Sequence, residues 1–490
     1  MASDHRLPRG GTGPSPRTGR APRLRSRTVR LDPPVDPFAL AGEAGFAWSG
    51  PDGTLTGAGV AARIPVGTGA GRVERAAEAA AALLGRAELD DPDGTGVGPL
   101  AVGALPFWAG APGELVVPAL LLRRNADGAA WATATAPAPA GPPPVAELLG
   151  RLRERAAARP AEGAAADPVE GEAPYAVEGE APYPGEGEVA YAVEGEGAAG
   201  ARRGAGSRRW MAARRWPAAR RLDRPDGPLD AWRGSVAWAL EAIASGRLDK
   251  VVLAREALVE AESPFPRAAL LERLRERAGR EAFVYASDGF LGASPELLVS
   301  RRGRVAVSRP MAGTVPRGAT AEAEARGLAR LTGSAKETVE HRLVVDAVAE
   351  GLAKVADRVE VAAPEVVRLA TVAHLATEVT AALTEPLPSA LELAGLLHPT
   401  PAVGGAPREP ALAAIAALEP FDRGRYAGPV GWVDAAGDGD WAVALRCADL
   451  HGRRARLLAG AGIVPGSDAE AEWAETEHKL AGTLELLLGP

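Results

Sequence analysis

The sequence has little of several residue types, and each shortage excludes a class of protein. Its 490 residues include a single cysteine, Cys447, so an intrachain disulfide framework and a cysteine-based zinc site are excluded. No apolar run is long enough to span a bilayer, and the N-terminus has no apolar stretch of the signal-peptide type. The formal net charge of −7 argues against general nucleic-acid binding. We therefore expect a cytoplasmic globular protein that is neither membrane-bound nor secreted.

Lysine is also scarce, because only four of the 56 basic residues are lysine: Lys250, Lys336, Lys354 and Lys479. A chain that uses arginine for nearly every positive charge can keep lysine where arginine cannot do the chemistry. A desolvated lysine can lose its proton and act as a base, whereas a guanidinium group cannot. Each lysine is thus a candidate for catalysis, or a residue that survives by chance on a solvated face.

Composition divides the chain, whose length fits two or three core-sized units. Residues 1–35 are predicted to be a disordered Arg-rich tail, and 36–158 to form the N-terminal part of the fold. Residues 159–226 hold an acidic Gly/Pro repeat and then an Arg-rich stretch, which indicates a flexible insertion. Its Arg/Trp segment at 202–221 could contact nucleic acid, although neutralising the acidic repeat is the simpler interpretation. Residues 227–490 have the densest regular pattern.

Periodicity predicts antiparallel hairpins that alternate with helices, which is an α+β architecture. Asp230 is a candidate N-cap for a helix that stops near Gly246. The other predicted helices cover 77–84, 336–355 and 469–487, and the predicted strands cover 46–48, 54–55, 115–123, 250–260, 283–286, 291–300, 305–308, 430–434, 441–447 and 455–463.

The last predicted helix is the most informative local feature. Glu472, Glu475 and Lys479 share one face of it, which could hold a hard divalent cation beside an anionic substrate. An exposed ion-pair ladder has the same spacing. On the helix at 336–355, Glu340 borders the apolar stripe, where a carboxylate is costly unless it is paired or binds a metal.

Two further residues carry possible acid–base chemistry. Glu296 lies within an apolar strand, where desolvation would raise its pKa and make it a general acid at neutral pH. Lys250 opens the strand at 250–260 and could be a catalytic base, or could simply extend its amine to the surface.

From about residue 228 to the end, the chain resembles the chorismate-utilising enzymes, and most closely their isochorismate synthase branch. One motif alone would be weak evidence, but an ordered set with plausible spacing is specific. The motifs are Lys250–Arg255 (KVVLAR), Gly292–Leu298 (GASPELL), Pro310–Thr314 (PMAGT), Glu340–His341, His374–Thr377 (HLAT), His398–Val403 (HPTPAV), Tyr426–Trp432 (YAGPVGW), Ala444–Cys447 (ALRC), Ala459–Ile463 (AGAGI) and Glu472–Lys479 (EWAETEHK).

The resemblance implies two large antiparallel sheets packed face to face with outer helices, and a Mg²⁺-dependent reaction on chorismate. Lys250 would deprotonate the water that attacks C2 of the ring, and Glu296 would protonate the departing C4 hydroxyl. Glu340 and Glu475 would hold the magnesium ion, with Glu472 in support. The expected substrate-binding residues are Gly313, His374, Thr377, Ala402, Tyr426, Arg446, Gly460, Gly462 and Lys479.

Lys250 also discriminates between branches of the family. The aminating members, such as anthranilate synthases, typically carry glutamine there and use ammonia, so we expect water as the nucleophile and no glutaminase subunit. Salicylate synthases share the lysine and go on to eliminate pyruvate. Ala402 resembles the isochorismate synthases, whereas Tyr426 occurs in both branches. Isochorismate formation is the prediction and salicylate formation the alternative, in a siderophore or a menaquinone pathway. A non-enzymatic anion-binding protein is a further alternative.

Overall fold

The computed structural model describes residues 23–43, 45–157, 216–222, 229–279, 281–318, 320–368 and 372–489. The first 22 residues of the predicted tail and the acidic repeat lie outside this part of the chain. No helix within the described ranges is long and apolar enough to cross a membrane.

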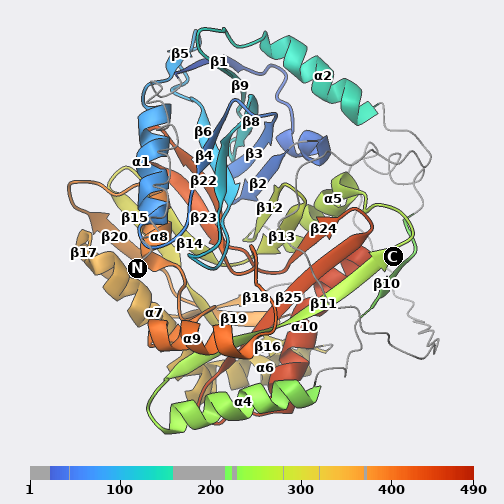
Figure 1. Cartoon of the computed structure of the whole chain (residues 1–490), viewed down its shortest axis with the longest axis vertical. Coiled ribbons are helices and arrows are strands. Elements are labelled where there is room, and N and C mark those ends of the chain that lie inside the picture. The colour runs from blue at the N-terminus through green and yellow to red at the C-terminus, as the bar shows by residue number, and fades with distance from the viewer. Residues whose placement is uncertain are drawn as a thin grey trace, which may run out of the picture. The chain divides into compact units, whose positions relative to one another are not determined.

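Two large sheets and one small sheet form the framework (Figure 1). The 13-stranded sheet is antiparallel except for the pair β1–β5, and β21 (Gly405–Ala406) adds to the start of β11. The order of its other strands is β10 (Ala219–Arg221), β11 (Lys250–Ala261), β25 (Arg454–Ile463), β24 (Cys447–His451), β13 (Phe290–Ser294), β12 (Phe283–Ser287), β2 (Phe46–Gly50), β3 (Gly53–Ala58), β8 (Leu120–Asn125), β9 (Ala130–Pro137), β1 (Leu24–Arg30) and β5 (Glu88–Asp90).

The second large sheet has nine strands and is antiparallel throughout. Its order is β17 (Ala356–Val361), β20 (Val379–Leu383), β15 (Val305–Arg309), β14 (Leu297–Arg302), β23 (Gly439–Val443), β22 (Pro429–Asp434), β6 (Leu100–Ala104), β7 (Glu114–Val117) and β4 (Ala62–Pro65). A three-stranded sheet consists of β16 (Met311–Pro316), β19 (Val372–Ala376) and β18 (Glu365–Arg368).

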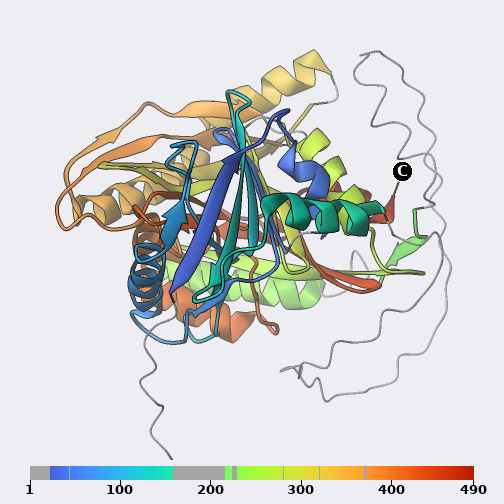
Figure 2. The ribbon, with the colours of Figure 1, turned by 90° about the horizontal axis from the view of Figure 1, so that it is seen from above.

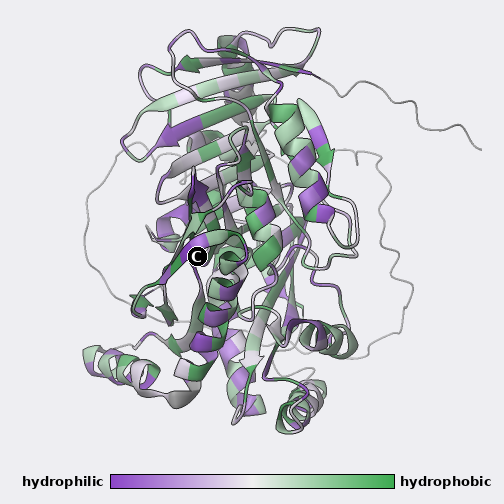
Figure 3. Ribbon diagram, turned by 90° about the vertical axis from the view of Figure 1, so that its left-hand side faces the viewer, coloured by the Kyte–Doolittle hydropathy of each residue, from purple (hydrophilic) through white to green (hydrophobic). Residues whose placement is uncertain are grey.

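Helices cover the sheets on their outer sides. The helices on the nine-stranded sheet are α1 (Arg72–Leu84), α7 (Ala335–Ala353) and α8 (Ala390–Leu397). The helices on the 13-stranded sheet are α2 (Val145–Ala157), α4 (Leu229–Ala244), α5 (Arg267–Ala278), α9 (Arg408–Leu418), α10 (Ala469–Leu488) and the 3₁₀ helix η1 (Pro37–Glu43). Helix α6 (Ala321–Gly333) packs on the small sheet. The view from above shows α1 and α2 on opposite sides of the N-terminal strands (Figure 2). Many helices present one hydrophobic and one hydrophilic side (Figure 3), as expected for helices that bury a single face.

One hydrophobic core lies between the two large sheets. Trp48 and Tyr285 enter it from the 13-stranded sheet, and Val430 and Trp441 enter it from the nine-stranded sheet. The predicted fold class is thus confirmed. The described residues up to 157 and those from 217 onward form a single compact unit, so the N-terminal and C-terminal parts are not separate domains. Each of the two parts contributes strands to both large sheets, so neither part could bury its strands alone.

Two predicted boundaries are wrong at their edges. The predicted tail contains β1, in which Leu24, Ser26 and Thr28 are buried while Arg25 and Arg27 point outward. This period of two is the pattern of a half-buried strand, but the arginines obscure it in the composition. The predicted insertion also contains β10, which pairs with β11. The candidate N-cap Asp230 lies within the first turn of α4.

Three predicted strands are each divided between the two large sheets. The prediction at 115–123 becomes β7 and β8, which separate at Pro118, where proline cannot donate to a ladder. The prediction at 291–300 becomes β13 and β14, with Glu296 between them, and 441–447 becomes β23 and the start of β24, with Arg446 between them. Two of these three crossing points carry predicted site residues.

Candidate active site

Eleven of the fourteen predicted site residues line one cavity. The cavity lies where the two sheet-crossing points meet the strands β11, β16, β19 and β25 and the helices α7 and α10. These eleven residues are Glu296, Gly313, Glu340, His374, Ala402, Tyr426, Arg446, Gly460, Gly462, Glu475 and Lys479. The other three, Lys250, Thr377 and Glu472, are buried but do not line the cavity, and Lys250 contacts the lining residue Glu340.

Glu296 is a buried acid at the crossing from β13 to β14, and only 3% of it is exposed. Burial raises its pKa to about 8, although Lys250 and Arg446 act in the opposite direction. The carboxyl group therefore keeps its proton at neutral pH and can donate it to a leaving group. The prediction of a raised pKa at this residue agrees with the geometry, but the residue lies between two strands and not within one.

Lys250 begins β11 and forms an ion pair with Glu340 of α7, with 2.8 Å between Nζ and Oε1. Its side chain is 1% exposed, so it does not extend to the surface. The two side chains meet over Gly462 of β25. A Cβ atom at Gly462 would lie 3.0 Å from Cε of Lys250 and would collide with Oε1 of Glu340. Glycine at this strand position is what allows the lysine and the glutamate to approach each other.

Arg446 and Lys479 form the cationic side of the cavity. Lys479 of α10 pairs with Glu475 at 2.5 Å and donates a hydrogen bond to the carbonyl oxygen of Gly460 at 2.9 Å. Arg446 adopts a positive φ of 49° at the crossing from β23 to β24, and burial lowers its pKa. Two cations against one paired carboxylate suit a ligand that carries negative charge.

His374 of β19 is held in one orientation. Its Nδ1 lies 3.0 Å from the carbonyl oxygen of Gly313 and 3.2 Å from Oγ1 of Thr314. Since the carbonyl can only accept, we assign the proton to Nδ1. Burial and the nearby cations Arg446 and Lys479 lower the pKa of His374 to about 3, so the ring is neutral at physiological pH.

The remaining predicted residues have supporting positions. Thr377 accepts or donates a 2.7 Å hydrogen bond with Nε2 of His341 and is not part of the cavity lining. Ala402 and Tyr426 both line the cavity. Burial raises the pKa of Tyr426 to about 12, so its hydroxyl stays protonated. Glu472 lies one turn before Glu475 on α10 and is 3% exposed, so the predicted face of α10 does point inward.

Comparison with known proteins identifies the family. A family model described as chorismate binding enzyme matches residues 214–488. The chain belongs to the chorismate-binding enzyme family. Isochorismate synthase DhbC of Bacillus subtilis is 41% identical over 268 residues, which are 52% of this chain and 67% of DhbC. Isochorismate synthase EntC of Escherichia coli K12 is 34% identical over 51% of this chain and 65% of EntC, so the aligned segment spans about two thirds of these relatives.

A solved structure of a chorismate-binding enzyme matches nearly the whole chain. The menaquinone-specific isochorismate synthase MenF from Escherichia coli has a TM-score of 0.67 and 25% identity, and the match covers 96% of each chain. The N-terminal part outside the family model therefore also shares the fold of this relative.

The donor set of this chorismate-binding enzyme fits a hard divalent cation. Glu340 of α7 and Glu475 of α10 both line the cavity, and oxygen ligands of this kind suit magnesium, which keeps several waters and needs few carboxylates. Within the described residues, no three His, Cys, Asp or Glu side chains are grouped closely enough to form a complete protein cage. A cation at this site would complete its coordination with water and substrate oxygens.

Sequence reasoning missed the role of Glu337, one turn before Glu340 on α7. Its Oε2 accepts a hydrogen bond from the amide of Thr314 at 3.2 Å. Gly313 has a φ of +74°, and a Cβ atom there would lie 2.8 Å from the same oxygen. The spacing of Glu337 and Glu340 could have indicated this role, because residues three apart in an α-helix share one face. The apolar wall residues Val252 and Val403 were also missed, since valine in a strand carries no functional signal.

Proposed function

We propose that the protein is a magnesium-dependent isochorismate synthase. It converts chorismate to isochorismate by attack of water at C2 of the ring and loss of the C4 hydroxyl. The observation that supports this best is a buried lysine, Lys250, and a protonated buried glutamic acid, Glu296, beside one cavity with a cationic side. The ion-pair partner of Lys250, Glu340, lines the same cavity as Glu296, which places the lysine and the acid at one site.

In this proposal Lys250 leaves the ion pair with Glu340 and, as the neutral amine, removes a proton from water as the C2–O bond forms. The two ring double bonds shift, the C4–O bond breaks, and Glu296 gives its proton to the departing hydroxyl, which leaves as water. The water consumed equals the water released, so the reaction is an isomerisation. Glu340 holds Lys250 in place before substrate binds.

The substrate carboxylates would bind at the cationic side of the cavity, where Arg446 and Lys479 lie. Glu340 and Glu475 would hold the magnesium ion, and Glu472 would support the ion directly or through water. The ion supplies positive charge for the ring carboxylate. His374 stays neutral and offers Nε2, whose distance to a guanidinium nitrogen of Arg446 is 3.5 Å, so it would orient that arginine without adding charge.

We also propose that the enzyme acts in the cytoplasm. It needs no glutaminase subunit in this proposal, because water and not ammonia is the nucleophile. Salicylate synthase is the alternative, since Tyr426 lines the cavity and the lysine base is common to both activities.

Product analysis by chromatography after incubation with chorismate and Mg²⁺ tests the proposal. We expect isochorismate, with neither salicylate nor anthranilate. Salicylate together with pyruvate would establish the alternative activity, and anthranilate in the presence of ammonium would contradict the assignment of Lys250. Recovery of unchanged chorismate from folded, magnesium-loaded protein would overturn the proposed function.

A further inference from the structure

One edge of β11 is only partly paired. β21 pairs with Lys250 and Val251 at its beginning, and β10 pairs with 259–261 at its end. Along the same edge, no described strand pairs with 252–258. Alternate residues of a strand direct both N–H and C=O to the same edge. A buried backbone group without a partner costs about 1–3 kcal/mol, so the groups at this edge need other partners.

Backbone groups outside the strands supply two of them: the amide of Val252 donates to the carbonyl oxygen of Gly404, and the carbonyl oxygen of Leu258 accepts from the amide of Leu222, both at 2.8 Å. Two side chains supply two more. Glu419, at the end of α9, accepts a hydrogen bond from the amide of Ala254 at 2.7 Å. Arg423 donates to the carbonyl oxygen of Val252 at 2.8 Å and to that of Val403 at 2.7 Å. The two side chains also bind each other, with Nε to Oε2 at 2.8 Å and a terminal nitrogen to Oε1 at 2.6 Å. They bind the edge of β11 at Val252 and Ala254, where no described strand pairs with it.

This ion pair is fully enclosed, because the side chains of Arg423 and Glu419 are 0% and 4% exposed. The guanidinium also lies 4.5 Å from the ring centroid of Phe107, in the N-terminal part of the chain. A buried ion pair is poor evidence for stability, since apolar residues of similar volume often stabilise a core equally well. Apolar residues could not, however, bind the three backbone groups. Together with the backbone bond from Val252 to Gly404, these contacts indicate a role in holding two backbone segments together.

Both of those segments form the wall of the active-site cavity. Val252 and Val403 line it directly. Lys250 is two residues before Val252 on the same strand, and Ala402 precedes Val403. We propose that Glu419 and Arg423 are positioning residues, which fix the strand that carries Lys250 at a set distance from the Ala402–Val403 wall. This inference rests on the proposed function, in which Lys250 must approach one ring carbon.

The variant Arg423→Lys tests the inference. Lysine keeps the charge, but its ammonium group has three N–H donors at one point, so it cannot make all four hydrogen bonds that the guanidinium of Arg423 makes. We expect kcat to fall about 10- to 100-fold with little change in KM, because a small displacement of the base affects the reaction more than binding. We also expect faster amide hydrogen exchange at 250–255. Glu419→Gln is the second variant, in which an amide oxygen can still accept from Ala254, and it should show a smaller loss.

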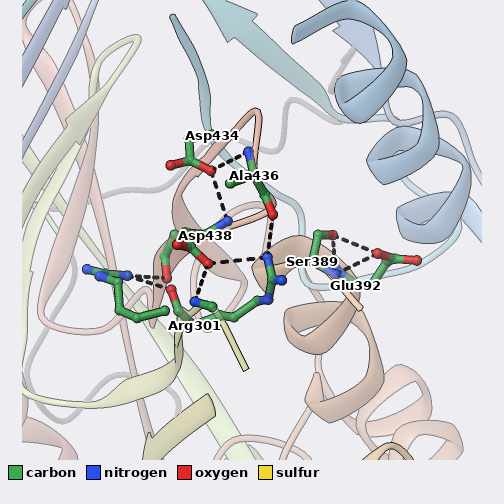
Figure 4. A network of polar contacts seen from close by, with 9 residues as sticks. Arg301, Ser389, Glu392, Asp434, Ala436 and Asp438 are labelled. Carbon is green, nitrogen blue, oxygen red and sulfur yellow. Dashed lines mark hydrogen bonds and ion pairs between the residues drawn. The ribbon is translucent and has the colours of Figure 1, made fainter. Parts of the chain in front are cut away.

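Arg301 offers a matched control. It is 4% exposed and donates to the carbonyl oxygen of Ala436 at 2.6 Å, and it lies 3.3 Å from Oδ1 of Asp438. Figure 4 shows this arginine at the turn between β22 and β23, beside the Ser389–Glu392 cap of α8. It does not line the cavity. We expect Arg301→Lys to lower the melting temperature while kcat per folded enzyme stays at the wild-type value.

The outcomes separate the two proposals. Wild-type enzyme that forms no isochorismate would refute the proposed function. Active wild type, with Arg423→Lys retaining kcat per folded enzyme, would refute the positioning role alone. A loss of kcat without faster exchange at 250–255, or an equal loss in Arg301→Lys, would also refute it, since the effect would then not pass through the strand.

Discussion

The protonated carboxyl group of Glu296 leads to a prediction with two independent measurements. Its pKa is raised to about 8 by burial, from 4.5 for an ordinary glutamate. Between these pH values the native state keeps a proton that the unfolded chain has released. The free energy of unfolding should therefore fall as pH rises, by about 1.4 kcal/mol per pH unit, and this loss should end above pH 8. The contribution of the protonated Glu296 carboxyl group to the free energy of unfolding is fully present only below pH 4.5.

The variant Glu296→Gln removes the ionisation and keeps the shape of the side chain. We expect the difference in free energy of unfolding, wild type minus variant, to fall by about 4 kcal/mol between pH 5 and pH 8. Denaturant unfolding at several pH values measures it, and the protonated-carboxyl band in infrared difference spectra checks it directly. The same substitution removes the proposed general acid, so kcat should fall about 100- to 10,000-fold.

The two measurements can contradict the reasoning separately. Parallel pH profiles for wild type and Glu296→Gln would mean that the carboxyl group ionises normally and cannot store a proton at neutral pH. If the free energy of unfolding of Glu296→Gln depends less on pH than that of the wild type, but the variant keeps its turnover, then the buried acid exists but does not act on the leaving hydroxyl. Glu360→Gln, on the exposed part of β17, is the control, and its turnover should equal that of the wild type.

Three further predictions concern the same cavity. Lys250→Gln should abolish isochorismate formation with the circular dichroism spectrum unchanged, and measurable turnover would exclude this lysine as the base. A chelator should stop activity, and added Mg²⁺ should restore it. The variant Glu475→Gln should raise the magnesium concentration needed for half of the maximal activity. Activity that a chelator does not change would contradict the carboxylate assignments. Because the pKa of His374 is about 3, the dependence of kcat on pH should show no ionisation of this histidine between pH 5 and 8. If the variant His374→Gln changes the shape of this pH dependence in the same range, the assignment of a neutral His374 is refuted.

Most of the local structure of the C-terminal part could be predicted from the sequence. The spacing of Glu472, Glu475 and Lys479 places them on one face of α10, because an α-helix repeats every 3.6 residues. That this face points inward could not be predicted, since an exposed ion-pair ladder has the same spacing. The packing of α10 on β25 decides it, where Lys479 reaches the carbonyl oxygen of Gly460.

The points where the chain crosses from one large sheet to the other could not be predicted from the sequence. A strand has the same alternation of side chains whichever sheet it joins, so periodicity does not reveal where the chain changes from one sheet to the other. Glu296 and Arg446 lie at such points. Their distance from other site residues depends on which strands pair with β13, β14, β23 and β24, and this pairing is a property of the whole molecule.

The amino-acid sequence alone thus determined which residues could do the chemistry, because amines, carboxyl groups and glycines have intrinsic capacities that survive in any fold. The tertiary structure decided which of them meet. It buried Glu296, brought Lys250 of β11 against Glu340 of α7 over Gly462, and placed Arg423 and Glu419 against the backbone of Val252 and Ala254. Desolvation and contact between residues distant in the chain depend on packing, which no local pattern of residues specifies.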